Sequence, residues 1–259
     1  MRILINLLRE VPKWDRPSQL GLTIATILLI IDLVVLSTQD NLQTPALIGA
    51  VGLILAIQAI FMWGNRNLVT PVTQAQRQML AGNFQGAVNT LTEYINTEEY
   101  YDLDALVLLG NAYRNLGNLE DSEKCLLQAL DRRVDNHFAL YGLAKTALAK
   151  GDYPFAIDHF KEALANDGHK TIHFDLALAY FKLGDTRRTV NHLQQLPTLD
   201  EPYRNLFVAY MQSEIGQPHD ELHQYADGLV FWQAEAERFK HTLYGQSIAQ
   251  DVTQLEKIL

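Results

Sequence analysis

The sequence predicts an all-α protein with three parts: a two-helix transmembrane hairpin, an α-solenoid of helical hairpins and a helical C-terminal cap. Two apolar runs, residues 20–36 and 46–63, flank a short polar connection, and each is long enough to cross a bilayer as a helix. Farther along, a Gly-Asn or Gly-Asp pair recurs at intervals of 35, 34 and 33 residues, beginning at Gly82, Gly117, Gly151 and Gly184. A period near 34 indicates stacked helical hairpins, in which each unit buries its apolar face against its neighbours.

Residues 1–17 are expected to form an amphipathic segment. One helical face carries the apolar side chains Leu4, Leu7, Leu8, Val11 and Trp14. A helix with such a face can lie flat on a membrane surface. The alternative is an ordinary lead-in helix that packs on the repeats.

Two transmembrane helices are expected within residues 18–66, at about 19–38 and 44–64. The connection at 37–44 is short, so the two runs form a hairpin, and helices satisfy their backbone hydrogen bonds inside the bilayer. The alternative for the first run is a cleaved signal peptide. Asp32, the lack of a small-residue cleavage site and the second run close behind argue against that alternative.

The charges that flank the hairpin predict its orientation. Basic residues lie on both outer flanks, at Arg2, Arg9, Lys13, Arg16, Arg66 and Arg77. The connection carries Asp40 and no Lys or Arg. Because basic flanks stay in the cytoplasm, we expect an integral membrane protein with both termini and the repeat domain cytoplasmic. Trp14 and Trp63 are then expected near the cytoplasmic interface.

Two polar side chains, Asp32 and Gln58, lie within the apolar runs. A carboxyl group at bilayer depth is costly and raises the hypothesis of an ion, proton or signalling role. The alternative is that Asp32 is protonated or hydrogen-bonded at a helix–helix contact. Counting helical rise places Asp32 at the level of residues 51–52 and Gln58 at the level of Thr23 or Thr26, so the two should not meet.

Gly52 and Ala56 form a small-xxx-small pair in the second run. Small residues at this spacing let helices approach closely. A homodimer through the transmembrane helices is therefore a further expectation.

Residues 67–216 are expected to form the repeats. Each glycine ends one helix, where a left-handed backbone costs it little, and the next helix begins at once. A small residue in each second helix permits close packing, at Ala87, Ser122, Ala156 and Thr189. Gly216 is a fifth, eroded repeat position.

The third unit shows the repeat pattern most fully. Its first helix carries Leu143-Ala144, and Gly151 is followed by Tyr153, Ala156, Phe160 and Ala163-Leu164. Such spacings resemble the tetratricopeptide repeat, and the resemblance covers about residues 68–200. The departures are that the family's Leu-Gly is intact only at Leu109-Gly110 and that its closing Pro is missing throughout.

A stack of such hairpins has a concave groove lined by the first helix of each unit. In the tetratricopeptide-repeat family this groove is the usual binding site. Counting back from each glycine places these side chains in it: Asn111, Arg114, Phe138, Tyr141, Lys145, Phe174, Phe181, Tyr203 and Tyr210. The aromatic set favours a partner peptide or helix with apolar anchors. The alternative for each aromatic residue is packing between hairpins, because a register error of one residue exchanges groove for core.

Residues 217–259 lose the repeat but keep apolar residues at helical spacing. They are expected to form a helical cap on the exposed end of the stack. The alternative is that they fold into the groove as an internal ligand, which would make the groove switchable.

Composition argues against several classes of function. From residue 67 onward there are 16 Lys and Arg against 26 Asp and Glu, and this net charge of −10 disfavours a nucleic-acid partner. Two pairs of histidines, His219 with His223 and His169 with His173, are spaced four apart, but neither has the Glu of the zinc-protease motif. Cys125 has no second cysteine to pair with. We expect no metal, no cofactor and no enzymatic activity.

The predicted function is a membrane-anchored scaffold or adaptor that binds a partner protein in the groove of a cytoplasmic repeat domain. The alternative is an accessory subunit of a membrane transporter or signalling complex. In that case the transmembrane hairpin is the working part, through Asp32 and Gln58.

Overall fold

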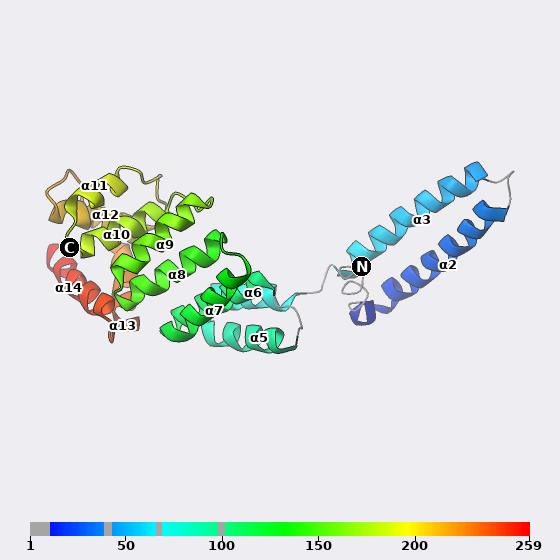
Figure 1. Cartoon of the computed structure of the whole chain (residues 1–259), viewed down its shortest axis with the longest axis horizontal. Helices are drawn as coiled ribbons and strands as arrows, with labels where there is room; N and C mark the ends of the chain where they lie inside the picture. Colours follow the sequence, from blue (N-terminus) through cyan, green and yellow to red (C-terminus); the bar gives the residue numbers. More distant parts are fainter. Residues whose placement is uncertain (1–10, 39–42, 66–68, 98–101) are drawn as a thin grey trace. The chain divides into compact units, whose positions relative to one another are not determined.

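The computed structural model describes residues 11–38, 43–65, 69–97 and 102–259. The chain divides into two compact units, residues 1–69 and 70–259, which we describe separately (Figure 1). All regular secondary structure in the described residues is helical, which confirms the all-α prediction. Most of residues 1–17, the expected amphipathic segment, lies outside the described residues.

The first unit is an antiparallel pair of helices, α2 (Arg16–Thr38) and α3 (Gln43–Gly64). Both are long enough and apolar enough to cross a membrane. They approach each other through small residues, because Ala25, Ala46 and Ala50 are buried while the large aliphatic side chains face outward.

The register of this hairpin follows from two close approaches. A Cβ atom on Gly21 would contact Ile60, and one on Gly49 would lie 3.0 Å from Oδ2 of Asp32. Asp32 therefore faces α3 two to three residues from the predicted level. The same register sets Gln58 opposite Thr23, so Asp32 and Gln58 are far apart along the helices.

Trp14 closes the open end of the hairpin. Its ring packs edge-on against Phe61 with centroids 4.7 Å apart, lies against Gly64, and donates from Nε1 to Oδ1 of Asn65 at 3.1 Å. Gln19 fixes the preceding turn, η1 (Val11–Lys13), by donating to three backbone carbonyls of residues 11–14. Trp14 thus lies at the same end of the hairpin as Trp63, but its indole ring is buried.

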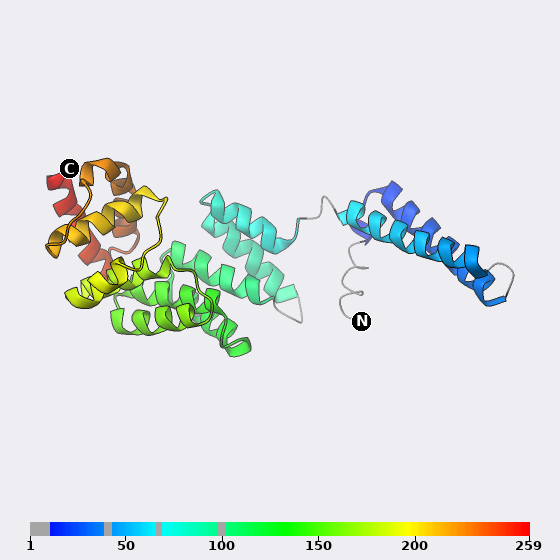
Figure 2. The ribbon, with the colours of Figure 1, turned by 90° about the horizontal axis from the view of Figure 1, so that it is seen from above.

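The second unit begins with paired helices. The first helices are α4 (Pro71–Leu80), α6 (Leu103–Asn115), α8 (His137–Lys150), α10 (Ile172–Lys182) and α12 (Pro202–Glu214), of which α12 has no second helix directly after it. The second helices are α5 (Phe84–Thr97), α7 (Leu119–Arg132), α9 (Tyr153–Ala165) and α11 (Thr186–Leu193). Figures 1 and 2 show these pairs stacked side by side.

The glycines end the first helices as predicted. All five have positive φ, between 67° and 89°: Gly82, Gly117, Gly151, Gly184 and Gly216. Side chains next to three of them then cap the following helix, with Asn83, Asp152 and Asp185 each accepting from a backbone N–H three residues on. The small residues of the second helices are fully buried. The helix-ending glycines are therefore confirmed through Gly216, and the small residues of the second helices through Thr189.

After Gly216 the chain changes course. No second helix follows at once, and residues 217–221 connect to η4 (Leu222–Gly228), α13 (Leu229–Arg238) and α14 (Leu243–Ile258). In Figure 2 these elements, orange to red, lie beside α12. Their buried residues join one continuous core with those of α8, α9, α10 and α12.

Candidate functional site

The first helices present a common face, which we call the inner surface. On α8 it carries Phe138, Tyr141, Lys145 and Ala149, because spacings of three and four residues keep side chains on one side of a helix. Asn111 and Arg114 lie on α6, Phe174 and Phe181 on α10, and Tyr203 and Tyr210 on α12. All nine predicted groove residues thus lie on first helices.

The C-terminal helices cover much of the inner surface. The ring of Trp232, on α13, packs against Phe207 at 4.1 Å between centroids and lies 6.3 Å from Phe174. Its Nε1 donates to the carbonyl oxygen of Tyr203 at 2.7 Å. Phe174 and Tyr210 are consequently buried, so neither is free to touch a partner directly.

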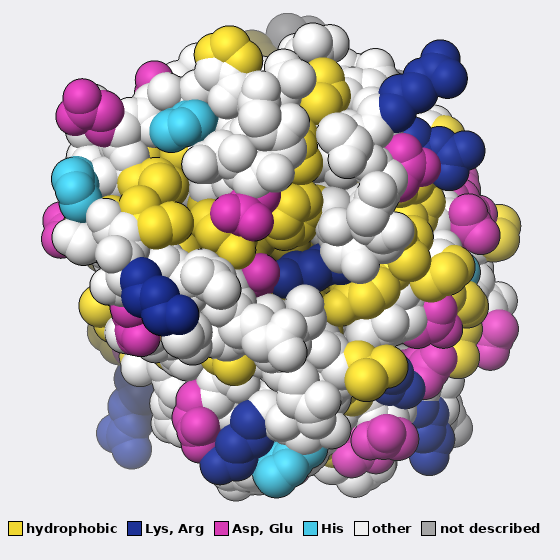
Figure 3. Space-filling model, turned by 90° about the vertical axis from the view of Figure 1, so that its left-hand side faces the viewer, with side chains coloured by type: hydrophobic (Ala, Val, Ile, Leu, Met, Phe, Trp, Pro, Cys, Tyr) yellow, Lys and Arg dark blue, Asp and Glu magenta, His cyan; other side chains and the backbone are white. Residues whose placement is uncertain are grey.

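A buried ion pair joins α14 to the inner surface. Nζ of Lys182 contacts Oδ2 of Asp251, and their side chains are only 4% and 13% exposed. Lys182 also donates to Oγ of Ser247 at 2.9 Å, and the hydroxyl of Tyr210 donates to Oδ1 of Asp251 at 3.3 Å. The space-filling view in Figure 3 shows hydrophobic, acidic and basic side chains around a hollow on one face of the molecule.

Burial makes each charge of this pair costly. It lowers the pKa of Lys182, an effect that the charge of Asp251 opposes, and it raises the pKa of Asp251, an effect that Lys182 opposes. Burial, reinforced by the charge of Asp251, also raises the pKa of Tyr210. Each member of the cluster therefore depends on the others for its stable ionisation state.

A second polar cluster joins α8 to α10. Oδ1 of Asp175 lies 2.9 Å from Nζ of Lys145, and Oδ2 accepts from the hydroxyl of Tyr141 at 2.9 Å. Burial raises the pKa of Tyr141, and the charge of Asp175 adds to the increase. Burial alone would lower the pKa of Lys145, but Asp175 and neighbouring groups raise it overall. Lys145 therefore stays protonated.

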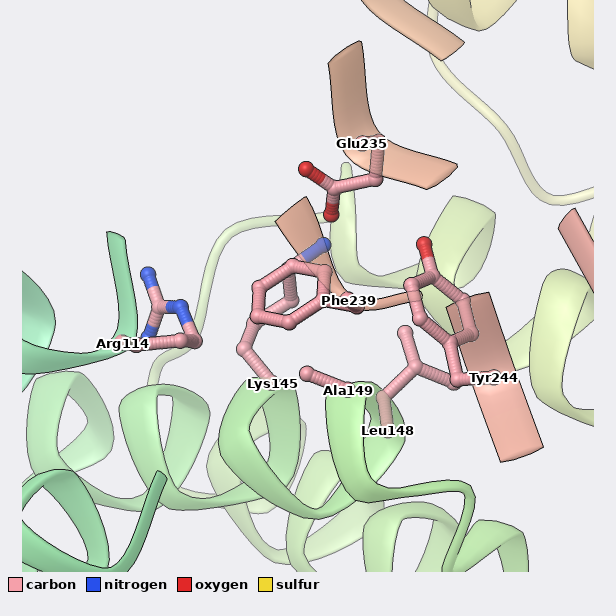
Figure 4. Close-up of a pocket in the computed structure, with 7 residues that line it drawn as sticks. All are labelled: Arg114, Lys145, Leu148, Ala149, Glu235, Phe239 and Tyr244. Atoms are coloured by element: carbon pink, nitrogen blue, oxygen red, sulfur yellow. The ribbon is translucent and has the colours of Figure 1, made fainter. Parts of the chain in front are cut away.

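A small pocket lies between the inner surface and the C-terminal helices (Figure 4). Arg114 and Lys145 line one side of it, and Glu235 of α13, Phe239 of the turn after α13 and Tyr244 of α14 face them. Burial lowers the pKa of Arg114, and Glu235 is among the groups whose charge opposes this. Arg114 also donates to Oδ1 of Asn111 at 2.7 Å and to the carbonyl oxygen of Gly142 at 3.3 Å.

Phe138 is the predicted groove residue that remains open, with 60% of its surface exposed. It lies at the start of α8, beyond the pocket, and its ring is 4.0 Å from that of His137. Apart from the buried Phe174 and Tyr210, the other predicted groove residues are half-buried: Asn111, Arg114, Tyr141, Lys145, Phe181 and Tyr203. The inner surface thus has a covered part and an open part.

Residues 101–168 match the family model described as Tetratricopeptide repeat. This part of the chain contains tetratricopeptide repeats. The matched residues include α6 to α9, and so Phe138, Tyr141 and Lys145, but not Asp175 of α10.

Several solved structures resemble the chain in fold. MamA from Desulfovibrio magneticus RS-1, residues 41 to the end, is 20% identical over 62% of this chain and 89% of that one, with a TM-score of 0.48. A MamA RS-1 ArsTM double mutant is 19% identical over 72% of this chain and 93% of that one, with a TM-score of 0.48. A tetratricopeptide repeat protein from Parabacteroides merdae ATCC 43184 is 13% identical over 73% of this chain and 78% of that one, with a TM-score of 0.46. No curated protein matches the chain.

Three residues that organise the inner surface were not predicted from the sequence: Asp175, Trp232 and Asp251. Each carboxylate does leave a trace, because Asp175 lies between Phe174 and Leu176 and Asp251 lies beside Val252. An acid within an apolar stripe signals a buried partner. The sequence does not say which cation that partner is.

Neither histidine pair lies within one α-helix. His219 precedes η4 and His223 lies within it, so the two lack the spacing that an α-helix would give them. Nδ1 of His173 lies 2.9 Å from Nδ1 of His192, not beside His169. Within the described residues, no group of three or more His, Cys, Asp or Glu side chains is placed to hold a metal ion.

Proposed function

We propose that this chain is a membrane-tethered scaffold that binds a partner protein through its tetratricopeptide repeats. The repeats have no assembled catalytic group among the residues described above, and they expose an aromatic side chain on the inner surface. Binding rather than catalysis is the activity that suits such a surface.

Membrane tethering is supported by the outward-facing side chains of α2 and α3. Their large aliphatic residues are exposed along both helices, and an exposed apolar patch of this extent needs an apolar environment. The basic flanks favour a cytoplasmic repeat domain and cytoplasmic termini. Tethering would raise the local concentration of a bound partner near the bilayer.

The partner contact is proposed at the open part of the inner surface, around Phe138. This single observation carries the proposal: Phe138, an aromatic side chain on a first helix, is 60% exposed, while the other predicted aromatic residues of the inner surface are buried or half-buried. Exposed aromatic anchors dominate the energy of many peptide-binding surfaces. Asn111 and Arg114 supply polar groups on the neighbouring helix.

The test is crosslinking of the full chain in its native membrane, followed by identification of the crosslinked proteins. Phe138→Ala should lose a partner that the wild-type chain retains. Leu127→Ala is the matched control, because Leu127 is exposed but lies on the second helix α7. Loss of the same partner with both variants, or with neither, would contradict a Phe138-centred site.

A second candidate function is an accessory subunit that acts through the hairpin. The observation in its favour is that Oδ2 of Asp32 is buried against Gly49 with no hydrogen-bond partner. Gln58, Gly52 and Ala56 lie on exposed positions of α3 and are free to contact another membrane helix. If Asp32→Asn abolishes cellular function while Phe138→Ala leaves it intact, this second function is the correct one.

A further inference from the structure

One face of α14 is built like a bound ligand helix. Tyr244, Ile248, Val252 and Leu255 follow at spacings of four, four and three residues, and all are buried. Residues on the opposite face of α14 are exposed. An amphipathic helix that lays its apolar stripe into a groove uses the same spacing.

The inner surface adds a charge requirement to this apolar fit. Lys182 is buried there and meets Asp251 of α14, while Tyr210 donates to the same carboxylate. A helix that occupied this position without a carboxylate would leave the ammonium of Lys182 buried and unpaired, which is strongly unfavourable. The site therefore selects an acidic amphipathic helix.

The position of α14 in the chain lets it leave. It follows all five first helices in the sequence and is joined to α13 by the short turn at residues 239–242. Dissociation of α14 from the inner surface therefore breaks no chain connection within a helical hairpin. The hairpins keep their own buried small residues and caps.

We propose that the inner surface of α8, α10 and α12 binds an acidic amphipathic helix of a partner protein, and that α14 occupies this site until the partner displaces it. The inference rests on the proposed scaffold function and adds a second, covered site to the open one at Phe138. The partner helix carries an apolar stripe at the α14 spacing and a carboxylate that reaches Lys182.

The burial of α14 has a measurable consequence. Tyr244, Ile248 and Leu255 are fully buried, so α14 is rarely dissociated and a competing helix meets few free sites. The apparent affinity of that helix falls in proportion to the free fraction. Releasing α14 should therefore strengthen binding in trans.

The experiment uses the full chain in detergent micelles and a fluorescent peptide with the sequence of residues 242–259. Asp251→Lys places two ammonium groups together and should release α14, while Lys182 stays available to the peptide. We expect this variant to bind the peptide at least about tenfold more tightly than the wild type. A peptide carrying Asp251→Lys should not bind.

Two further variants sharpen the comparison. Glu256→Lys reverses a charge on the exposed face of α14 and should leave peptide binding as weak as in the wild type. Combining Lys182→Asp with Asp251→Lys restores an opposite pair and should weaken binding again. Asp251→Asn, which removes the charge without repulsion, is measured alongside in case Asp251→Lys does not fold.

Hydrogen exchange of the α14 amides completes the test. Fast exchange confined to α14, together with tighter peptide binding, supports the proposal. It is overturned if α14 exchanges fast but the peptide binds no better, if α14 stays protected in both Asp251 variants, or if both lose protection throughout the hairpins. If the peptide experiment fails while partner crosslinking still depends on Phe138, only the proposed α14 site is rejected. If the peptide experiment succeeds while crosslinking does not depend on Phe138, only the open site is rejected.

Discussion

Replacing Asp175 tests whether the Lys145 cluster stabilises the fold. The Asp175 side chain is only 2% exposed and contacts both Nζ of Lys145 and the hydroxyl of Tyr141 at 2.9 Å. Asp175→Asn keeps the shape of the side chain and one acceptor oxygen. It removes the charge that faces the ammonium of Lys145.

The expected loss follows from the burial of the two partners. Breaking a buried ion pair by removing one member costs about 3–5 kcal/mol. The Lys145 side chain is 24% exposed, so water offsets part of that cost, and we expect a loss of about 3 kcal/mol in the free energy of unfolding. For a unit of this size the melting temperature should fall by about 6–12 °C.

The assay is urea unfolding of the full chain followed by circular dichroism. Glu237→Gln is the control, because the Glu237–Lys240 pair is exposed and should contribute less than about 1 kcal/mol. Lys145→Met combined with Asp175→Leu should recover most of the stability, since an apolar pair leaves no buried charge. A loss below about 1 kcal/mol for Asp175→Asn, or a double variant as unstable as the sum of its singles, would refute the reasoning.

Three further predictions concern backbone, pH and thiol chemistry. Gly151→Ala should destabilise the domain more than Gly184→Ala, because both have positive φ but only at Gly151 would the new Cβ lie 2.7 Å from Cβ of Leu243; urea midpoints of the two variants compare them. Burial, aided by neighbouring cations, lowers the pKa of His192 to about 4 in the folded chain. As the pH falls, the imidazole of His192 is therefore protonated in the unfolded chain before it is protonated in the folded chain. The free energy of unfolding that is present above pH 6.5 should fall by about 1 kcal/mol, after allowance for solvent screening, as the pH falls towards 4. His192→Gln should flatten that part of the stability–pH curve. Burial raises the pKa of the Cys125 thiol to about 11, so a thiol reagent at pH 8 should label Cys125 only after unfolding, and rapid labelling of the folded chain would contradict this.

The repeat architecture was predictable because its determinants are local. A glycine that ends a helix acts through its own φ, and Asp152 or Asp185 caps the next helix through a contact three residues away. Such features repeat with the chain and can be read without knowing the tertiary structure. That is why even the eroded position at Gly216 was found.

The occupancy of the groove was not predictable in the same way. Whether Phe174 and Tyr210 face a partner or the core depends on Trp232 and α14, which lie far along the sequence. Spacing along a helix identifies a face but not what covers it. The sequence left two alternatives for residues 217–259, an end cap or an internal ligand. Their contacts in the structure have features of both: η4 packs beside α12, as an end cap would, and α14 reaches α8, as an internal ligand would.

The buried carboxylate of Asp251 also explains how the apolar stripe of α14 finds one register on an apolar surface. Sliding α14 by one turn would bring another residue of its apolar face over α10 with little change in buried area. It would also separate Asp251 from Lys182 and leave both charges buried without partners. That penalty is far larger than the difference between two apolar contacts. The ion pair therefore acts mainly by excluding the wrong registers, and for the same reason a displacing helix must carry its carboxylate at the matching position.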